Sequence, residues 1–243
     1  MKDTVTFKQW KLSQKSYKQL CHWVTQSLNK GQSASILSLN PEIWIHSLKN
    51  EFFTKTLQQA DILLPDGIGL TLANQFWRKE KLLKRSGSEL IFYYLNHGYY
   101  PVYLLGSSNK NNHLAIKNIK NKQVHCLGGH DGFFNEHTEQ VIETLKKLPA
   151  CLVLCGLGYP KQEQFIAQVC KKAKQEKWPE PKVFLACGGM IDVLAGHKPF
   201  APKWVRNCYL EWLYSGIVQP QRFKRWLIWM PRFFIEIFRG LFL

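Results

Sequence analysis

Asp66 is the residue best placed for acid–base chemistry. It follows an apolar run at residues 62–65 and precedes a Gly-Ile-Gly segment, so we expect it at the tip of a strand, beside the start of a helix. A carboxylate at such a place could remove a proton from an acceptor hydroxyl. An aspartate before a helix also commonly caps it, and position alone favours the cap.

A second polar segment, residues 155–163, reads CGLGYPKQE. It resembles the dinucleotide fingerprint G-x-G-x-x-G, but Lys161 occupies the place of the third glycine. Pro160 suits the first turn of a helix, which puts Lys161, Gln162 and Glu163 in that turn, where they would face a ligand. Hydride transfer with a nicotinamide cofactor is therefore only the alternative hypothesis.

Metal-dependent sugar transferases commonly hold a divalent ion on a diphosphate with an Asp-x-Asp pair. The sequence contains no such pair. If the chain transfers a sugar, we expect no metal and no cofactor, and we expect arginine and lysine to stabilise the departing phosphates.

The apolar pattern of the sequence predicts the strands and helices that would position these residues. Strand-like runs recur with helical stretches between them, several of them continuous, as expected for strands covered on both faces. This alternation predicts an α/β fold: a Rossmann-like, doubly wound and mostly parallel sheet of about six strands. The strands are predicted at residues 34–39, 61–64, 101–105, 124–127, 151–155 and 183–186, and the helices at 41–59, 68–78, 109–119, 136–148 and 160–177.

Glycines and small polar residues follow nearly every predicted strand. In an open α/β sheet, ligands bind outside the carboxyl ends of the strands, where helix N-termini favour phosphate. Each of these segments alone could be a tight turn, but together they favour a polar crevice for a ligand the size of a nucleotide.

The chain is strongly basic, with 33 Lys and Arg against 17 Asp and Glu, a formal net charge of +16. Such a balance attracts nucleic acid, anionic lipid or phosphorylated substrates, without deciding among them. Seven scattered cysteines predict a reducing compartment. The first residues lack an apolar signal core, so we expect a cytoplasmic protein.

Residues 196–243, here called the tail, are basic and aromatic and contain no predicted strand. Arg222, Arg225, Arg232 and Arg239 recur at helical spacing, a pattern typical of a helix that lies in a membrane interface. Recurrent charges and Pro231 argue against a membrane-spanning helix. A helix packed on the protein's own core fits almost as well, and nucleic-acid binding ranks third. We predict a catalytic domain at 1–195 and a membrane-associating appendage at 196–243.

Seven segments resemble the WecG/TagA/CpsF family of bacterial glycosyltransferases, and they occur in the same order as in that family. They lie at residues 38–42, 65–69, 87–90, 156–163, 188–196, 201–204 and 210–214. Any one match would be unspecific, but the ordered set is specific and covers most of the chain.

The resemblance implies an inverting, metal-independent transferase of surface polysaccharide biosynthesis. Its donor would be a UDP-linked N-acetylmannosamine-type sugar (N-acetylmannosamine or its uronic acid), and its acceptor N-acetylglucosamine on polyprenyl diphosphate. It also implies a Rossmann-like domain with a C-terminal appendage, peripheral on the inner face of the cell membrane and bound to an anionic surface. Nucleic acid is not an expected partner, and a homo-oligomer is possible. A nicotinamide-dependent oxidoreductase and a non-catalytic nucleic-acid-binding module are the alternatives.

The resemblance assigns Asp66 as the catalytic base. It therefore favours a catalytic role for this residue over a role as a helix cap alone. The expected substrate-binding residues are Ser38, Asn40, Gly67, Arg85, Gly156, Gly158, Lys161, Gln162, Glu163, Gly189, Asp192, Arg222 and Arg225. The chain departs from the family pattern at three places. Ser38 occupies a position where the family usually has threonine. Lys84 occupies a position where the family favours arginine, and Arg85 is one residue further along. Ser215 occupies another position where the family often has arginine.

Overall fold

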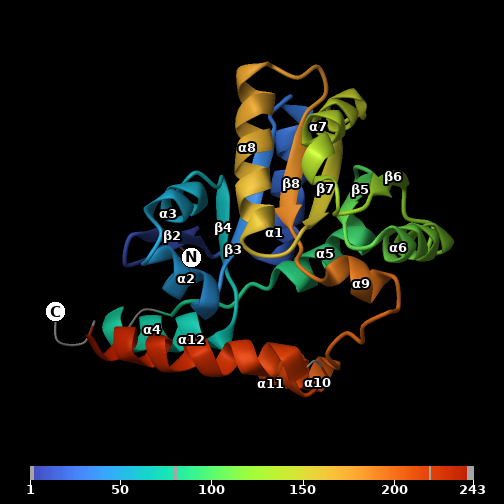
Figure 1. Cartoon of the computed structure of the whole chain (residues 1–243). Helices are drawn as coiled ribbons and strands as arrows, with labels where there is room; N and C mark the ends of the chain where they lie inside the picture. Colours follow the sequence, from blue (N-terminus) through green and yellow to red (C-terminus); the bar gives the residue numbers. More distant parts are fainter. Residues whose placement is uncertain (1–2, 79–80, 219, 240–243) are drawn as a thin grey trace.

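The structure is a computed structural model that describes residues 3–78, 81–218 and 220–239 of the 243-residue chain; for residues 78 and 220–227 it describes the backbone only. Its centre is a six-stranded, all-parallel sheet with the strand order β4-β3-β8-β7-β5-β6 (Figure 1). The strands are β3 (Ala34–Leu39), β4 (Ile62–Pro65), β5 (Val102–Gly106), β6 (Cys126–His130), β7 (Cys151–Gly156) and β8 (Lys182–Ala186). The predicted six-stranded parallel sheet is confirmed.

The sheet is covered on both faces, because its strands bury side chains alternately to either side. In β3, for example, Ile36 packs into one hydrophobic cluster and Leu37 into the other. Continuous apolar runs are what such doubly covered strands require. One face is covered by α2 (Pro41–Ser47), α3 (Glu51–Gln58), α7 (Thr138–Lys147) and α8 (Lys161–Gln175), and the other by α1 (Tyr17–Asn29), α5 (Gly87–His97), α6 (Asn109–Asn121) and α9 (Met190–Leu194).

The chain leaves adjacent strands β3 and β8 toward opposite faces. Helix α2 follows β3 on the first face, whereas α9 follows β8 on the second. The adjacent strands β7 and β5 diverge in the same way, toward α8 on the first face and α6 on the second. In an open α/β sheet, ligands bind at such topological switch points. We therefore expect the candidate site at the carboxyl ends of these strands.

Several local features differ from the sequence prediction. The segment expected as one helix at 41–59 is two helices, because Asn50 caps α3 by accepting a hydrogen bond from the Phe53 amide at 2.9 Å. In addition, an N-terminal hairpin, β1 (Thr4–Phe7) and β2 (Trp10–Ser13), packs beside β4. Its Phe7 and Trp10 are fully buried in the first cluster.

The tail forms helices α10 (Lys203–Asn207), α11 (Glu211–Val218) and α12 (Pro220–Arg239), which lie with α4 (Ile68–Arg78) along one edge of the molecule (Figure 1). The helix α12 continues through Pro231, which the sequence analysis expected to interrupt it. Phe233 is only 3% exposed and packs edge-on against Trp44 of α2, with ring centroids 5.6 Å apart. The Trp77 indole N–H donates to the Ile237 carbonyl at 2.9 Å. The tail thus shares the first core cluster, and the division at 195/196 stays a prediction.

Candidate active site

Asp66 lies directly after β4, at the carboxyl edge of the sheet. Its amide donates to the Leu39 carbonyl at 2.8 Å, which fixes the residue beside the end of β3. The residue is half-buried. Burial raises the pKa of its carboxyl group to about 6, while the charge of Lys84 opposes this rise and that of Glu211 adds to it. The predicted position at a strand tip is confirmed, and the role as a base stays a prediction.

The positive charge of Lys84 acts on Asp66 and lowers the pKa of its carboxyl group. The Arg85 amide donates to the Pro65 carbonyl at 2.8 Å and so ties this segment to the end of β4. The Arg85 guanidinium donates to the carbonyls of Lys15 at 2.7 Å and Lys84 at 3.0 Å. The Lys84 side chain is 7% exposed, and its ammonium forms an ion pair with Glu211 of α11. Substrate binding by Arg85 stays a prediction, although its guanidinium has main-chain partners here.

Ser38 and Asn40 lie at the end of β3, next to Asp66. The Asn40 side-chain oxygen accepts a hydrogen bond from the Ile43 amide at 2.8 Å and thereby caps α2. A Cβ atom at Gly87 would lie 3.2 Å from the Ser38 hydroxyl, so a glycine there brings the start of α5 close to β3. The structure thus brings Ser38, Asn40 and Asp66 together.

Gln162 and Glu163 lie in the first turn of α8, and Gln162 connects this helix to the end of β8. The Gln162 amide oxygen accepts from the Gly188 N–H at 3.1 Å, and its nitrogen donates to the Glu163 carboxylate at 2.8 Å. Glu163 is fully buried, and its second oxygen has no partner among the described residues. Burial raises the pKa of this carboxyl group to about 7. A buried carboxyl group with an unsatisfied oxygen is costly unless it is protonated.

The predicted glycines allow the corners of the strands to approach one another. A Cβ atom on Gly156 would lie 2.8 Å from the Gly188 carbonyl oxygen, which leaves no room for a side chain. Gly158 and Gly67 have φ angles of 77° and 86°, in the left-handed region that glycine tolerates best. Gly189 precedes α9. These four residues shape the backbone at the ends of β4, β7 and β8.

Asp192 lies in α9, at the other side of the switch point. Its carboxylate accepts hydrogen bonds from Ser107, from Asn111 at 3.1 Å and from Lys198. Burial by itself would raise the pKa of this group, but the three donors outweigh it and hold the pKa below its ordinary value. Asp192 is therefore an ionised group with fixed partners.

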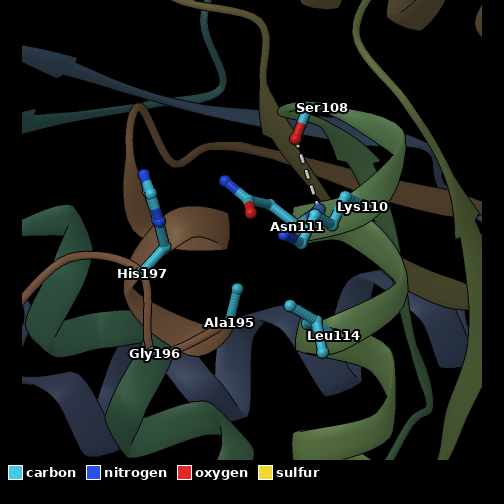
Figure 2. A pocket seen from close by; sticks show the side chains of 7 residues that line it. All are labelled: Ser108, Lys110, Asn111, Leu114, Ala195, Gly196 and His197. Carbon is cyan, nitrogen blue, oxygen red and sulfur yellow. Dashed lines mark hydrogen bonds between the residues drawn. The ribbon is translucent and has the colours of Figure 1, made fainter.

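A cavity of about 460 Å³ lies between α6 and the loop that follows α9. Figure 2 shows Asn111 and Leu114 facing Ala195 and His197 across it, with Ser108 capping the start of α6. Lys110 and His197 give the lining a basic character. Since Asn111 also donates to Asp192, the cavity borders the Asp192 cluster.

The contacts of Lys161 lie elsewhere, and two other predicted residues have side chains that the structure does not describe. Lys161 donates to the side chain of Asn135 and lies over the Phe134 ring, toward the loop after β6. Arg222 and Arg225 lie in α12, but their side chains are outside the described part of the chain. Their predicted contact with diphosphate stays a prediction.

Sequence reasoning assigned no role to Glu211 or Glu89, which lie near Asp66 and both influence the pKa of its carboxyl group. Both occur in the segments that carry the family resemblance, and this was the available signal. Within residues 3–78, 81–218 and 220–239, no three His, Cys, Asp or Glu side chains form a group able to hold a metal ion. In the same residues, no helix is both long and apolar enough to span a membrane.

Topology and site together define a Rossmann-like α/β protein with ionisable residues gathered at the carboxyl edge of its sheet. The sequence profile of the Glycosyl transferase WecG/TagA/CpsF family matches residues 5–242, and the chain belongs to this family. It is thus a glycosyltransferase by family, as the sequence analysis predicted.

Several relatives carry the name N-acetylglucosaminyldiphosphoundecaprenol N-acetyl-beta-D-mannosaminyltransferase. The chain is 28% identical to that of Bacillus spizizenii over 85% of this chain and 79% of the relative. It is 26% identical to that of Bacillus subtilis over 90% and 82%, and 26% identical to one from Staphylococcus aureus over 78% and 74%. A de novo designed Rossmann fold protein aligns with 46% of this chain at 17% identity and a TM-score of 0.25, a likeness too slight to bear on function.

Proposed function

We propose that the protein transfers an N-acetylmannosamine-type sugar from UDP to N-acetylglucosamine on polyprenyl diphosphate, with inversion and without a metal ion. The observation that carries this proposal is the Asp66 carboxyl group at the carboxyl edge of the sheet, with a pKa of about 6 and Lys84 beside it. The relatives' names support both the sugar and the acceptor.

Asp66 is suited to act as the general base. With a pKa of about 6 it is mostly ionised at neutral pH, yet more basic than an ordinary aspartate. It would take the proton of the acceptor hydroxyl as the oxygen attacks the anomeric carbon. The bond from that carbon to the UDP oxygen breaks at the same time, and UDP leaves with the electron pair. A single displacement of this kind inverts the anomeric centre.

Cations are needed where negative charge develops on the departing diphosphate. Lys84 is the described cation next to Asp66, and Arg222 and Arg225 are predicted to add to it from the tail. Charge-assisted hydrogen bonds from such groups stabilise phosphate oxygens without a metal ion.

The nucleotide is proposed to bind on the Asp192 side of the switch point. The cavity there has a volume within the ordinary range of small-molecule sites. It is bordered by the N-terminal turn of α6, where Ser108 caps the helix, and by Lys110. Backbone amides at a helix start and a nearby cation suit a phosphate group.

The tail and α4 are proposed to rest on the anionic inner face of the membrane. Although α12 buries Phe233 and Ile237 in the core, it leaves a second apolar surface uncovered. The exposed large apolar residues of α4, α11 and α12 are Leu72, Phe76, Trp212, Leu213, Ile217, Val218, Ile228, Phe234, Ile235 and Phe238. Apolar surface of this extent, together with the arginine-rich sequence of α12, fits a membrane interface.

The test is a transfer assay with a panel of UDP-sugars and a short-chain N-acetylglucosamine-diphosphate lipid, measuring UDP release and the product. We expect one N-acetylmannosamine-type donor to be used, with unchanged rates in EDTA and a β-linked product by NMR. No release of UDP with any donor would reject the proposal, whereas loss of activity in EDTA would reject only its metal independence.

A further inference from the structure

The tail meets the catalytic edge of the sheet through two ion pairs. Glu211 of α11 pairs with Lys84, which precedes α5, and Arg206 of α10 lies 3.5 Å from Glu89 in α5. Glu89 also accepts a hydrogen bond from the Tyr17 hydroxyl at 2.7 Å. The two ion pairs join segments more than 100 residues apart in the sequence.

Lys84 occupies a confined position between the tail and Asp66. Its side chain is 7% exposed, and its ammonium lies 5.1 Å from the centre of the Tyr209 ring. The backbone on its C-terminal side is held by the hydrogen bond from the Arg85 amide to the Pro65 carbonyl. A buried ammonium group needs a compensating charge, and Glu211 provides one from the tail.

We propose that Glu211 is a positioning residue: from the tail it holds Lys84 beside Asp66 and balances its charge, so that docking of the tail tunes the carboxylate. The proposal rests on the proposed function only in taking Asp66 as the base. It assigns no contact between Glu211 and a substrate. It implies that the charge of Lys84 beside Asp66 is balanced only when α11 packs against this edge of the sheet.

Several charged or titratable groups of the described residues interact electrostatically with Asp66. They are Lys84 from the segment before α5, Glu89 from α5, Glu211 from α11 and Tyr17 from α1. Lys84 lowers the pKa of Asp66, whereas Glu211 and Glu89 raise it. Since Lys84 and Glu211 act in opposite directions, removing either charge leaves the other uncompensated.

Opposite shifts are therefore expected for two single variants of the full-length protein. In Glu211→Gln the amide can still accept a hydrogen bond from Lys84, but its negative charge is gone, so the pKa of Asp66 falls. In Lys84→Met the negative charge of Glu211 remains without its partner, so the pKa of Asp66 rises. A neighbouring charge shifts a carboxyl pKa by about 1 unit or more. Glu236→Gln is the matched control, because Glu236 pairs with Arg239 elsewhere in the same tail, in α12.

The measurement is a ¹³C NMR titration of the protein labelled at aspartate side-chain carboxyls, with Asp66→Asn identifying the Asp66 resonance. A lower midpoint in Glu211→Gln, a higher one in Lys84→Met and an unchanged one in Glu236→Gln support the proposal. The proposal is overturned if either Glu211→Gln or Lys84→Met keeps the wild-type midpoint, or shifts it in the direction opposite to the one expected.

Kinetics separate this inference from the function on which it rests. If the protein transfers sugar, the acid limb of kcat/KM must move with the NMR midpoint in each variant, which a merely structural role of Glu211 would not produce. If the wild-type protein releases no UDP, the proposed function fails, and the NMR titration still decides whether Glu211 tunes Asp66.

Discussion

The side-chain amide of Gln162 donates to the carboxylate of Glu163, its neighbour in the first turn of α8, at 2.8 Å. The amide oxygen of Gln162 accepts at the same time from the Gly188 N–H at 3.1 Å. This chain of contacts joins α8 to the end of β8, and it leaves a fully buried carboxyl group with one oxygen unpartnered among the described residues.

Glu163→Gln is expected to stabilise the protein at alkaline pH. The pKa of Glu163 is raised to about 7 from an ordinary value of 4.5. Between these values the native state holds a proton that the unfolded state has lost, so stability falls as pH rises through this window. The loss above pH 7 amounts to at most about 3 kcal/mol, and the variant should escape it.

Urea unfolding of wild type and Glu163→Gln from pH 4 to pH 8 checks this. The two proteins should be similar near pH 4, where the wild-type carboxyl group is protonated, and should diverge toward pH 8. Asp66→Asn serves as the comparison, because the pKa of Asp66 is also raised, to about 6. Parallel curves for wild type and Glu163→Gln would show that Glu163 does not titrate in this range.

Asp66→Asn is expected to lower kcat by about 10²–10⁴-fold, because the amide cannot accept the proton of the acceptor hydroxyl. In the wild type, the rate should fall as the pH drops below about 6, where the carboxyl group becomes protonated. UDP release measured across pH 4.5–8.5 tests both points. Asp3→Asn, at an exposed residue that pairs with Lys15, is the control and should behave as wild type. Near-normal turnover by Asp66→Asn would remove Asp66 from the reaction.

Two phenylalanines of α12 should separate stability from membrane binding. Phe233 is 3% exposed and Phe238 is 58% exposed. Phe233→Ala should lower the free energy of unfolding by about 3–5 kcal/mol. Phe238→Ala should change it by about 0.5 kcal/mol or less, but should weaken binding to anionic liposomes by about tenfold, since it removes apolar area from the interface.

Denaturant unfolding and liposome co-sedimentation, performed on both variants, provide the two readouts. Equal co-sedimentation of Phe238→Ala and wild type would show that the uncovered face of α12 does not contact lipid. Neutral liposomes serve as the control for charge.

UDP should raise the thermal midpoint of the protein, whereas NAD should leave it unchanged. A ligand at a concentration of 100 times its Kd stabilises the native state by about 2.7 kcal/mol. Asp192→Asn should reduce the UDP-induced rise, measured from the midpoint of the ligand-free variant, because Asp192 organises Ser107, Asn111 and Lys198 beside the cavity. Stabilisation by NAD alone would instead favour the oxidoreductase alternative.

Much of the scaffold could be predicted because its signals are local. Continuous apolar runs identified all six strands of the sheet, and the small polar residues after them marked its carboxyl edge. Among the features that were missed, the N-terminal hairpin and the break at Asn50 involve short segments, which carry little periodicity. A carboxylate after an apolar run was also enough to single out Asp66.

By itself, then, the sequence determined the α/β class, the family and the candidate base, since each depends on residue types at fixed spacings along the chain. The contact of the Arg85 guanidinium with the Lys15 carbonyl depended on tertiary structure, because residues 15 and 85 meet only in the folded chain. The same holds for Glu211, which reaches Lys84 across 127 residues, and for the two apolar faces of α12. Burial and charge balance arise only when distant segments meet, so neither can be read from local spacing.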